Sequence, residues 1–87
     1  MVDVEEAFMR VTYSLTIEAK CPIDNEPDAY ECEITSTRTI PVEEILDAVK
    51  ELPKAFQEDV TVALARKLGA TVQTIGWHSG IKTKVVA

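Results

Sequence analysis

The stretch RVTYSLTIEAK, residues 10–20, alternates between polar and apolar or small side chains at every position. A repeat of two is the period of a β-strand with one buried face. The segment CPIDNEPD, residues 21–28, then breaks the alternation with two prolines and Asn25, which are residues typical of turns. Alternation resumes at Tyr30 and continues to Ile40. The sequence therefore predicts a long β-hairpin. Its first strand would bury one face: Val11, Tyr13, Leu15, Ile17 and Ala19.

Two helices are predicted after the hairpin. Pro41 suits a first helical turn, where its missing N–H costs nothing. Apolar residues then recur at helical spacing until Pro53 interrupts the pattern, so a second helix is expected to begin near Lys54. Gly69 is placed to end that helix. The apolar stripes of the two helices are Val42, Ile45, Leu46 and Val49, then Phe56, Val60, Leu64 and Leu68.

Two further strands are expected at 70–77 and 81–87, on either side of the turn HSG, residues 78–80. The order ββααββ predicts an α+β domain in which two helices cover one face of an antiparallel sheet. The 87 residues leave room for one domain, 1–87, and we expect its acidic segment 1–8 to be flexible. So small a domain buries only a modest core and is marginally stable alone, so we expect it to gain buried surface by self-association.

The formal net charge of −6 argues against non-specific nucleic-acid binding. The charge is uneven, however, because every acidic residue lies at or before Asp59 and four basic residues follow it. A basic face repeated in an oligomer is one interpretation. A solvated helix end and an edge strand protected by lysines is the other. The four residues are Arg66, Lys67, Lys82 and Lys84.

The sequence also bounds the class of protein. The first residues lack the basic stretch and apolar run of a signal peptide, and no stretch has membrane-spanning length, so a cytoplasmic protein with reduced thiols is expected. Two cysteines are too few for a disulfide scaffold, and no residues have metal-ligand spacing. No glycine-rich dinucleotide loop is present, so no cofactor is expected.

Cys21 and Asp28 stand at the two ends of a loop stiffened by Pro22 and Pro27. A thiol and a carboxyl held close together at the ends of one loop could act as a nucleophile and as a proton donor or acceptor, respectively. By themselves, these residue types are more typical of a packed cysteine and a turn-forming aspartate. Cys32, in mid-strand, is expected in the core, and a bond between Cys32 and Cys21 stays open.

The segment 21–28 resembles the CPxxxxPD segment of the 7-cyano-7-deazaguanine reductases, a family of tunnelling-fold nitrile reductases. The likeness continues in the family's order with Val42-Glu43, with FQEDVT at 56–61 and with GIKT at 80–83, and it extends from about Thr12 to Val86. It implies a tunnelling fold that assembles into rings, pentameric and paired as a decamer, with sites at subunit borders.

By position, the resemblance implies that Cys21 is the nucleophile, that Asp28 transfers a proton and that Glu58 anchors the heterocycle. A carboxylate can accept from the ring N–H and the amino group of a guanine-like edge. The alternative for Glu58 is an acid favoured by the helix dipole. Glu43 and His78 are further substrate-binding candidates, with surface decoration as the alternative for His78. Gln57 replaces a histidine of the family run, which argues against acid–base help from that position.

The chain departs from the reductases where they carry a Glu-Ser-Lys-Ser run that helps to bind phosphorylated nicotinamide. Residues 43–47 are EEILD, whose negative charge would repel a phosphate. The resemblance is thus closer to the QueF-like archaeosine synthases, which amidate 7-cyano-7-deazaguanine in tRNA. Ammonia would attack a Cys21 thioimidate and leave the amidine, and the four basic residues after Asp59 would contact RNA. The alternatives are an NADPH-dependent reductase and a non-catalytic tunnelling-fold subunit that binds a purine or pterin.

Overall fold

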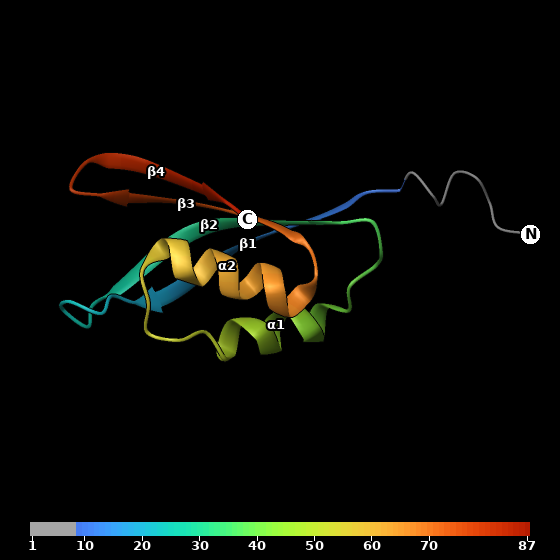
Figure 1. Cartoon of the computed structure of the whole chain (residues 1–87), viewed down its shortest axis with the longest axis horizontal. Coiled ribbons are helices and arrows are strands. Elements are labelled where there is room, and N and C mark those ends of the chain that lie inside the picture. The colour runs from blue at the N-terminus through green and yellow to red at the C-terminus, as the bar shows by residue number, and fades with distance from the viewer. Residues whose placement is uncertain (1–8) are drawn as a thin grey trace, which may run out of the picture.

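The computed structural model describes residues 9–87, so the expectation for 1–8 lies outside the described residues. The four strands form one layer and both helices lie against the same side of it (Figure 1). This arrangement confirms the α+β class and the predicted ββααββ order. The elements are β1 (Val11–Lys20), β2 (Pro27–Ser36), α1 (Val42–Lys50), α2 (Gln57–Leu68), β3 (Thr71–His78) and β4 (Ile81–Val86).

The sheet has the order β1-β2-β3-β4, and every neighbouring pair is antiparallel. Lys20 pairs with Pro27 where β1 passes into β2, and His78 pairs with Ile81 where β3 passes into β4. Since β2 and β3 are antiparallel, the start of β2 and the end of β3 lie at the same end of the sheet. The loop after β1 and the turn after β3 are therefore neighbours.

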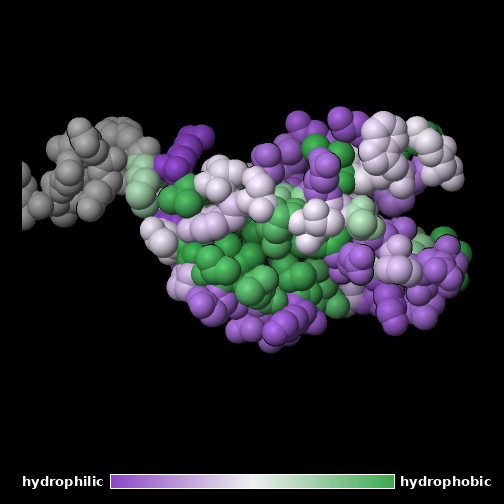
Figure 2. Space-filling view, turned by 180° about the vertical axis from the view of Figure 1, so that it is seen from behind, coloured by the Kyte–Doolittle hydropathy of each residue, from purple (hydrophilic) through white to green (hydrophobic). Residues whose placement is uncertain are grey.

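The core follows the predicted periodicity in the strands and in α2 from Val60 onward, but the predicted stripes were wrong at Val42, Leu46 and Phe56, which are exposed, and α1 buries Ala48 beside Ile45. Alternate residues of each central strand face the helices, and a stripe of each helix faces the sheet. β1 is less well covered, because Tyr13 and Leu15 are only partly buried while Ile17 and Ala19 are buried. Figure 2 shows, on the reverse side, hydrophobic side chains gathered between the β1 edge and the helix layer. The buried apolar residues are Ile17, Ala19, Tyr30, Cys32, Ile34, Ile40, Ile45, Ala48, Val60, Leu64, Leu68 and Val72.

Three predicted boundaries were wrong by a few residues. β2 ends at Ser36 instead of Ile40, because the Arg38 amide donates to Ser36 Oγ at 3.0 Å and bends the chain. α2 begins at Gln57 and not near Lys54, which puts the two acids that follow into its first turn. The C-terminal end of α2 was predicted correctly, since Gly69 adopts a left-handed φ of 59°.

The third boundary matters for the site. His78 is the last residue of β3 and not part of the turn, which consists of Ser79 and Gly80. Both turn residues have positive φ, 51° and 82°, as a two-residue hairpin turn whose twist matches the strands requires. His78 therefore takes its direction from the strand. Thr74, Gly76 and His78 follow one another on the face that the helices cover.

Gly76 is required by the close approach of Tyr30. A Cβ at position 76 would lie 2.5 Å from Tyr30 Cδ1 and 2.7 Å from Cε1. We predict that Gly76→Ala destabilises the fold by about 1–3 kcal/mol, because the ring must move out of a packed site. Urea unfolding measures the change. In a Tyr30→Leu background the same substitution should cost clearly less, and an equal cost in both backgrounds would contradict the role of the ring.

Candidate functional site

A closed loop holds Cys21 just beyond the end of β1. The Cys21 amide donates to Glu26 O at 2.9 Å, and the Asn25 amide donates to Cys21 O at the same distance. Asn25 has a φ of 62°, a conformation that asparagine tolerates better than most residues. The Glu26 amide also donates to Asp24 Oδ1 at 3.0 Å. The backbone at Cys21 is thus fixed from both sides, and its thiol is partly exposed.

A pocket of about 280 Å³ lies between this loop, the start of α2 and the end of β3. It brings together four side chains that sequence reasoning placed in a site: Cys21, Asp28, Glu58 and His78. Glu43 is not among its lining residues and lies exposed in the first turn of α1. The other lining residues are Ile23, Tyr30, Phe56 and Gln57.

Tyr30 is a site residue that sequence reasoning assigned only to the core strand. Its hydroxyl donates to Asp28 Oδ2 at 3.5 Å. Burial, followed by the charge of Asp28 and the hydrogen bond to it, raises the pKa of Tyr30 to about 12, and Cys21 and Glu58 add to the effect. The phenol is therefore neutral at physiological pH and acts as a donor towards the Asp28 carboxylate.

Gln57 is the second residue whose role the sequence did not show. Its side chain is 1% exposed, and Nε2 donates to Thr74 O at 3.2 Å, to Thr74 Oγ1 at 3.2 Å and to Thr83 O at 3.0 Å. Its Oε1 lies 2.8 Å from His78 Nε2. Thr61 Oγ1 donates to Gln57 O at 2.8 Å and lies 2.6 Å from Thr74 Oγ1. This network joins the first turn of α2 to both C-terminal strands.

The two cysteines have different environments and do not form a disulfide. Cys32 is buried in β2, as expected, and pairs across the sheet with Leu15. Burial, with a smaller contribution from Glu33, raises the pKa of the Cys32 thiol to about 11. Of the two thiols, only that of Cys21 lines the pocket.

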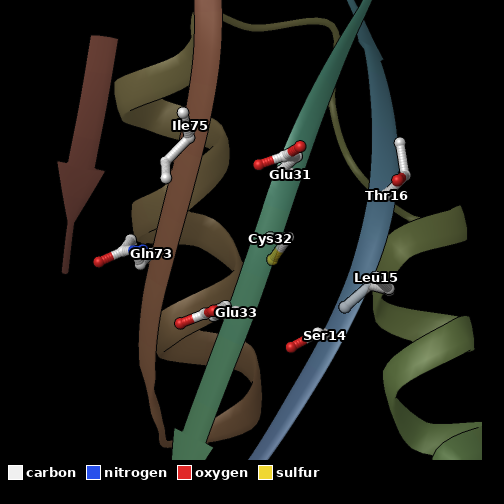
Figure 3. Close-up of a pocket in the computed structure, with 8 residues that line it drawn as sticks. All are labelled: Ser14, Leu15, Thr16, Glu31, Cys32, Glu33, Gln73 and Ile75. Atoms are coloured by element: carbon white, nitrogen blue, oxygen red, sulfur yellow. The ribbon is translucent and has the colours of Figure 1, made fainter. Parts of the chain in front are cut away.

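A second hollow, of about 320 Å³, lies on the sheet face that the helices leave open (Figure 3). Glu31 and Glu33 of β2 project into it beside Ser14 and Gln73, while the helices lie behind the sheet. Cys32 also borders this hollow but is buried, with a raised thiol pKa. The hollow thus offers two carboxylates without a reactive nucleophile, so nucleophilic chemistry is favoured at the Cys21 pocket.

Of the four basic residues predicted to contact RNA, two lie on the sheet and two on the helix layer. Lys82 and Lys84 pair with Trp77 and Ile75 and share the open face of the sheet with them. The other two, residues 66–67, lie in the last turn of α2, where Lys67 forms an ion pair with Glu51. One chain therefore does not gather the four into a single patch.

Within residues 9–87, no group of three or more His, Cys, Asp or Glu side chains is arranged to hold a metal ion. Over the same part of the chain, no helix combines the length and the apolar character needed to cross a membrane.

The fold matches that of a solved structure, the archaeosine synthase QueF-Like in its apo form, with a TM-score of 0.75. The chain has the fold of QueF-Like. The match covers 90% of each chain at 21% sequence identity, and at that identity it establishes the shared architecture. No protein-family model and no curated protein sequence matches the chain. The four-stranded antiparallel sheet with two helices on one side is thus a QueF-Like tunnelling fold.

The pocket geometry predicts selective labelling of one thiol. Iodoacetamide at neutral pH should modify Cys21 in the folded protein and spare Cys32, which is buried and holds its proton because its pKa is raised. Intact mass should show one label on the native protein, two after denaturation, and none on native Cys21→Ser. Label on native Cys32, or equal reactivity of both thiols, would contradict this description of the pocket.

Proposed function

We propose that this chain converts the nitrile of 7-cyano-7-deazaguanine in tRNA to an amidine with ammonia, through a thioimidate on Cys21. One observation carries the proposal: a thiol, two carboxyls and an imidazole line one pocket of about 280 Å³. That the fold is shared with an archaeosine synthase supports it further. The protein would then be an archaeosine synthase, an amidinotransferase that acts on a nitrile.

In the first step, the Cys21 sulfur bonds to the nitrile carbon and one C≡N π bond breaks. The Asp28 carboxylate is the proposed acceptor of the thiol proton, and it then donates that proton to the nitrogen, so that the thioimidate carries one N–H and Asp28 returns to its ionised form. The Tyr30 hydroxyl, which donates to Asp28 Oδ2, orients that carboxyl towards the pocket. In the second step, ammonia bonds to the thioimidate carbon and the C–S bond breaks. The sulfur leaves, and the product is the amidine.

Glu58 is the proposed anchor for the base. Its carboxylate stands in the first turn of α2 at the pocket wall and can accept from both the ring N–H and the amino group of a guanine-like edge. Ile23 and Phe56 form an apolar rim and are 81% and 47% exposed. We propose that an adjacent copy in a ring covers this rim. Glu43 can contribute to substrate binding only from such a neighbouring copy, because it does not line the pocket of its own chain.

The RNA part of the proposal assigns phosphate contacts to Arg66, Lys67, Lys82 and Lys84. In one chain these residues lie on the helix layer and on the open face of the sheet. The tRNA would therefore contact them as two separate sites, or as one continuous surface formed by several copies in an assembly.

Mass spectrometry of the protein with the nitrile base tests the proposal. Wild type should gain the full mass of the base, because the addition loses no atoms, and Cys21→Ala should gain nothing. Asp28→Asn should form the adduct about 10²–10⁴-fold more slowly. Added ammonium should release the amidine and restore the free thiol. Cys32→Ala is the matched control and should behave as wild type.

Two further arms decide between the alternatives. The same reaction with free base and with tRNA that carries the base shows which form is the substrate. Oxidation of reduced nicotinamide in the presence of the nitrile would identify a reductase instead. Identical unmodified masses for wild type and Cys21→Ala would contradict the covalent mechanism.

A further inference from the structure

The orientation of the Gln57 side-chain amide is fixed by its partners. Two of the atoms within hydrogen-bond distance of Nε2 are main-chain carbonyl oxygens, Thr74 O and Thr83 O, which can only accept. Turning the amide over would set Oε1 against both of these oxygens in a site that is 1% exposed. The amide nitrogen must therefore face the strands, and Oε1 must face His78.

This orientation determines which ring nitrogen carries the proton when His78 is neutral. Oε1 can only accept, so His78 Nε2, at 2.8 Å, must donate. We propose that Gln57 is a positioning residue that holds neutral His78 as its Nε2–H tautomer and leaves Nδ1 as the nitrogen with a lone pair. The inference rests on the proposed function and deepens it, because it gives the pocket a base for the ammonia step. Tyr30 lies beside the ring, with centroids 6.1 Å apart and planes at 50°.

Addition of ammonia requires such a base. When the ammonia nitrogen bonds to the thioimidate carbon, it acquires a positive charge and must lose a proton. Nδ1 accepts that proton and returns it to the sulfur as the C–S bond breaks, so the thiol and the neutral imidazole are both restored. An imidazole suits this exchange because one ring nitrogen can accept a proton while the other donates a hydrogen bond. His78, from β3, is the pocket's imidazole.

His78 is the only histidine in the chain, so its ring nitrogens can be observed without overlap. The test is a long-range ¹H–¹⁵N correlation spectrum of ¹⁵N-histidine-labelled protein, without substrate, at a pH where the ring is neutral. We expect Nε2 to be protonated, with its proton protected from exchange, and Nδ1 to be unprotonated. Neutral imidazole in water populates both tautomers, so Gln57→Leu should move both nitrogen shifts towards averaged values. Thr83→Val is the matched control, because it keeps the main-chain acceptor.

A proton on Nδ1 in wild type would overturn the inference, as would identical ring shifts in wild type and folded Gln57→Leu. If Gln57→Leu does not fold, the wild-type spectrum and the exchange protection of its Nε2–H decide alone. The kinetic arm uses His78→Phe, which should slow release of the adduct by ammonia about 10²-fold or more, and more than it slows capture of the nitrile. Equal slowing of both steps would contradict a role in the ammonia step. Failure of wild type to form any adduct would defeat the proposed function, whereas the tautomer is measured without substrate.

Discussion

The arrangement of the pocket depends on one buried amide. Gln57 joins the first turn of α2 to β3 through Thr74 and to β4 through Thr83, and its oxygen meets His78. Among residues 9–87, every fully buried side-chain nitrogen or oxygen has a hydrogen-bond partner. Loss of one such partner in a dry site costs about 1–3 kcal/mol, so the network tolerates little displacement. It thereby sets where the start of α2, with Phe56 and Glu58, stands relative to the loop of Cys21.

Much of the architecture was predictable because it follows from periodicity and backbone chemistry. Strict alternation over residues 10–20 marked the first strand, and Gly69 marked the end of α2, since a left-handed residue there suits glycine. The errors fell at the ends of elements, where local hydrogen bonds and turn geometry decide. β2 stops at Ser36 through a local hydrogen bond, and His78 joins β3 because the turn needs only Ser79 and Gly80.

The candidate site was also predicted only in part. Cys21, Asp28 and Glu58 were assigned through the resemblance of short segments to a known family, and these residues line one pocket. Tyr30 and Gln57 were missed because their roles depend on which residues of β3 lie opposite them. The Tyr30 ring occupies the space that Gly76 leaves, and Gln57 binds Thr74, which lies two residues before Gly76 on the same face. The basic residues illustrate the converse. Of the two interpretations of these residues, the helix end and the lysine-bearing edge strand is the arrangement found in one chain: Lys82 and Lys84 lie on the open face of the sheet, and residues 66–67 end a helix on the other side.

The shared fold constrains the architecture, and the proposed reaction depends on the Cys21 pocket. The most direct measurement is a crystal structure of the protein grown with 7-cyano-7-deazaguanine. The account predicts continuous density from Cys21 Sγ to the former nitrile carbon, with the guanine-like edge of the base against Glu58. A base bound elsewhere, for example in the hollow beside Glu31 and Glu33, or a base in the pocket whose nitrile stays unattached to sulfur, would contradict it.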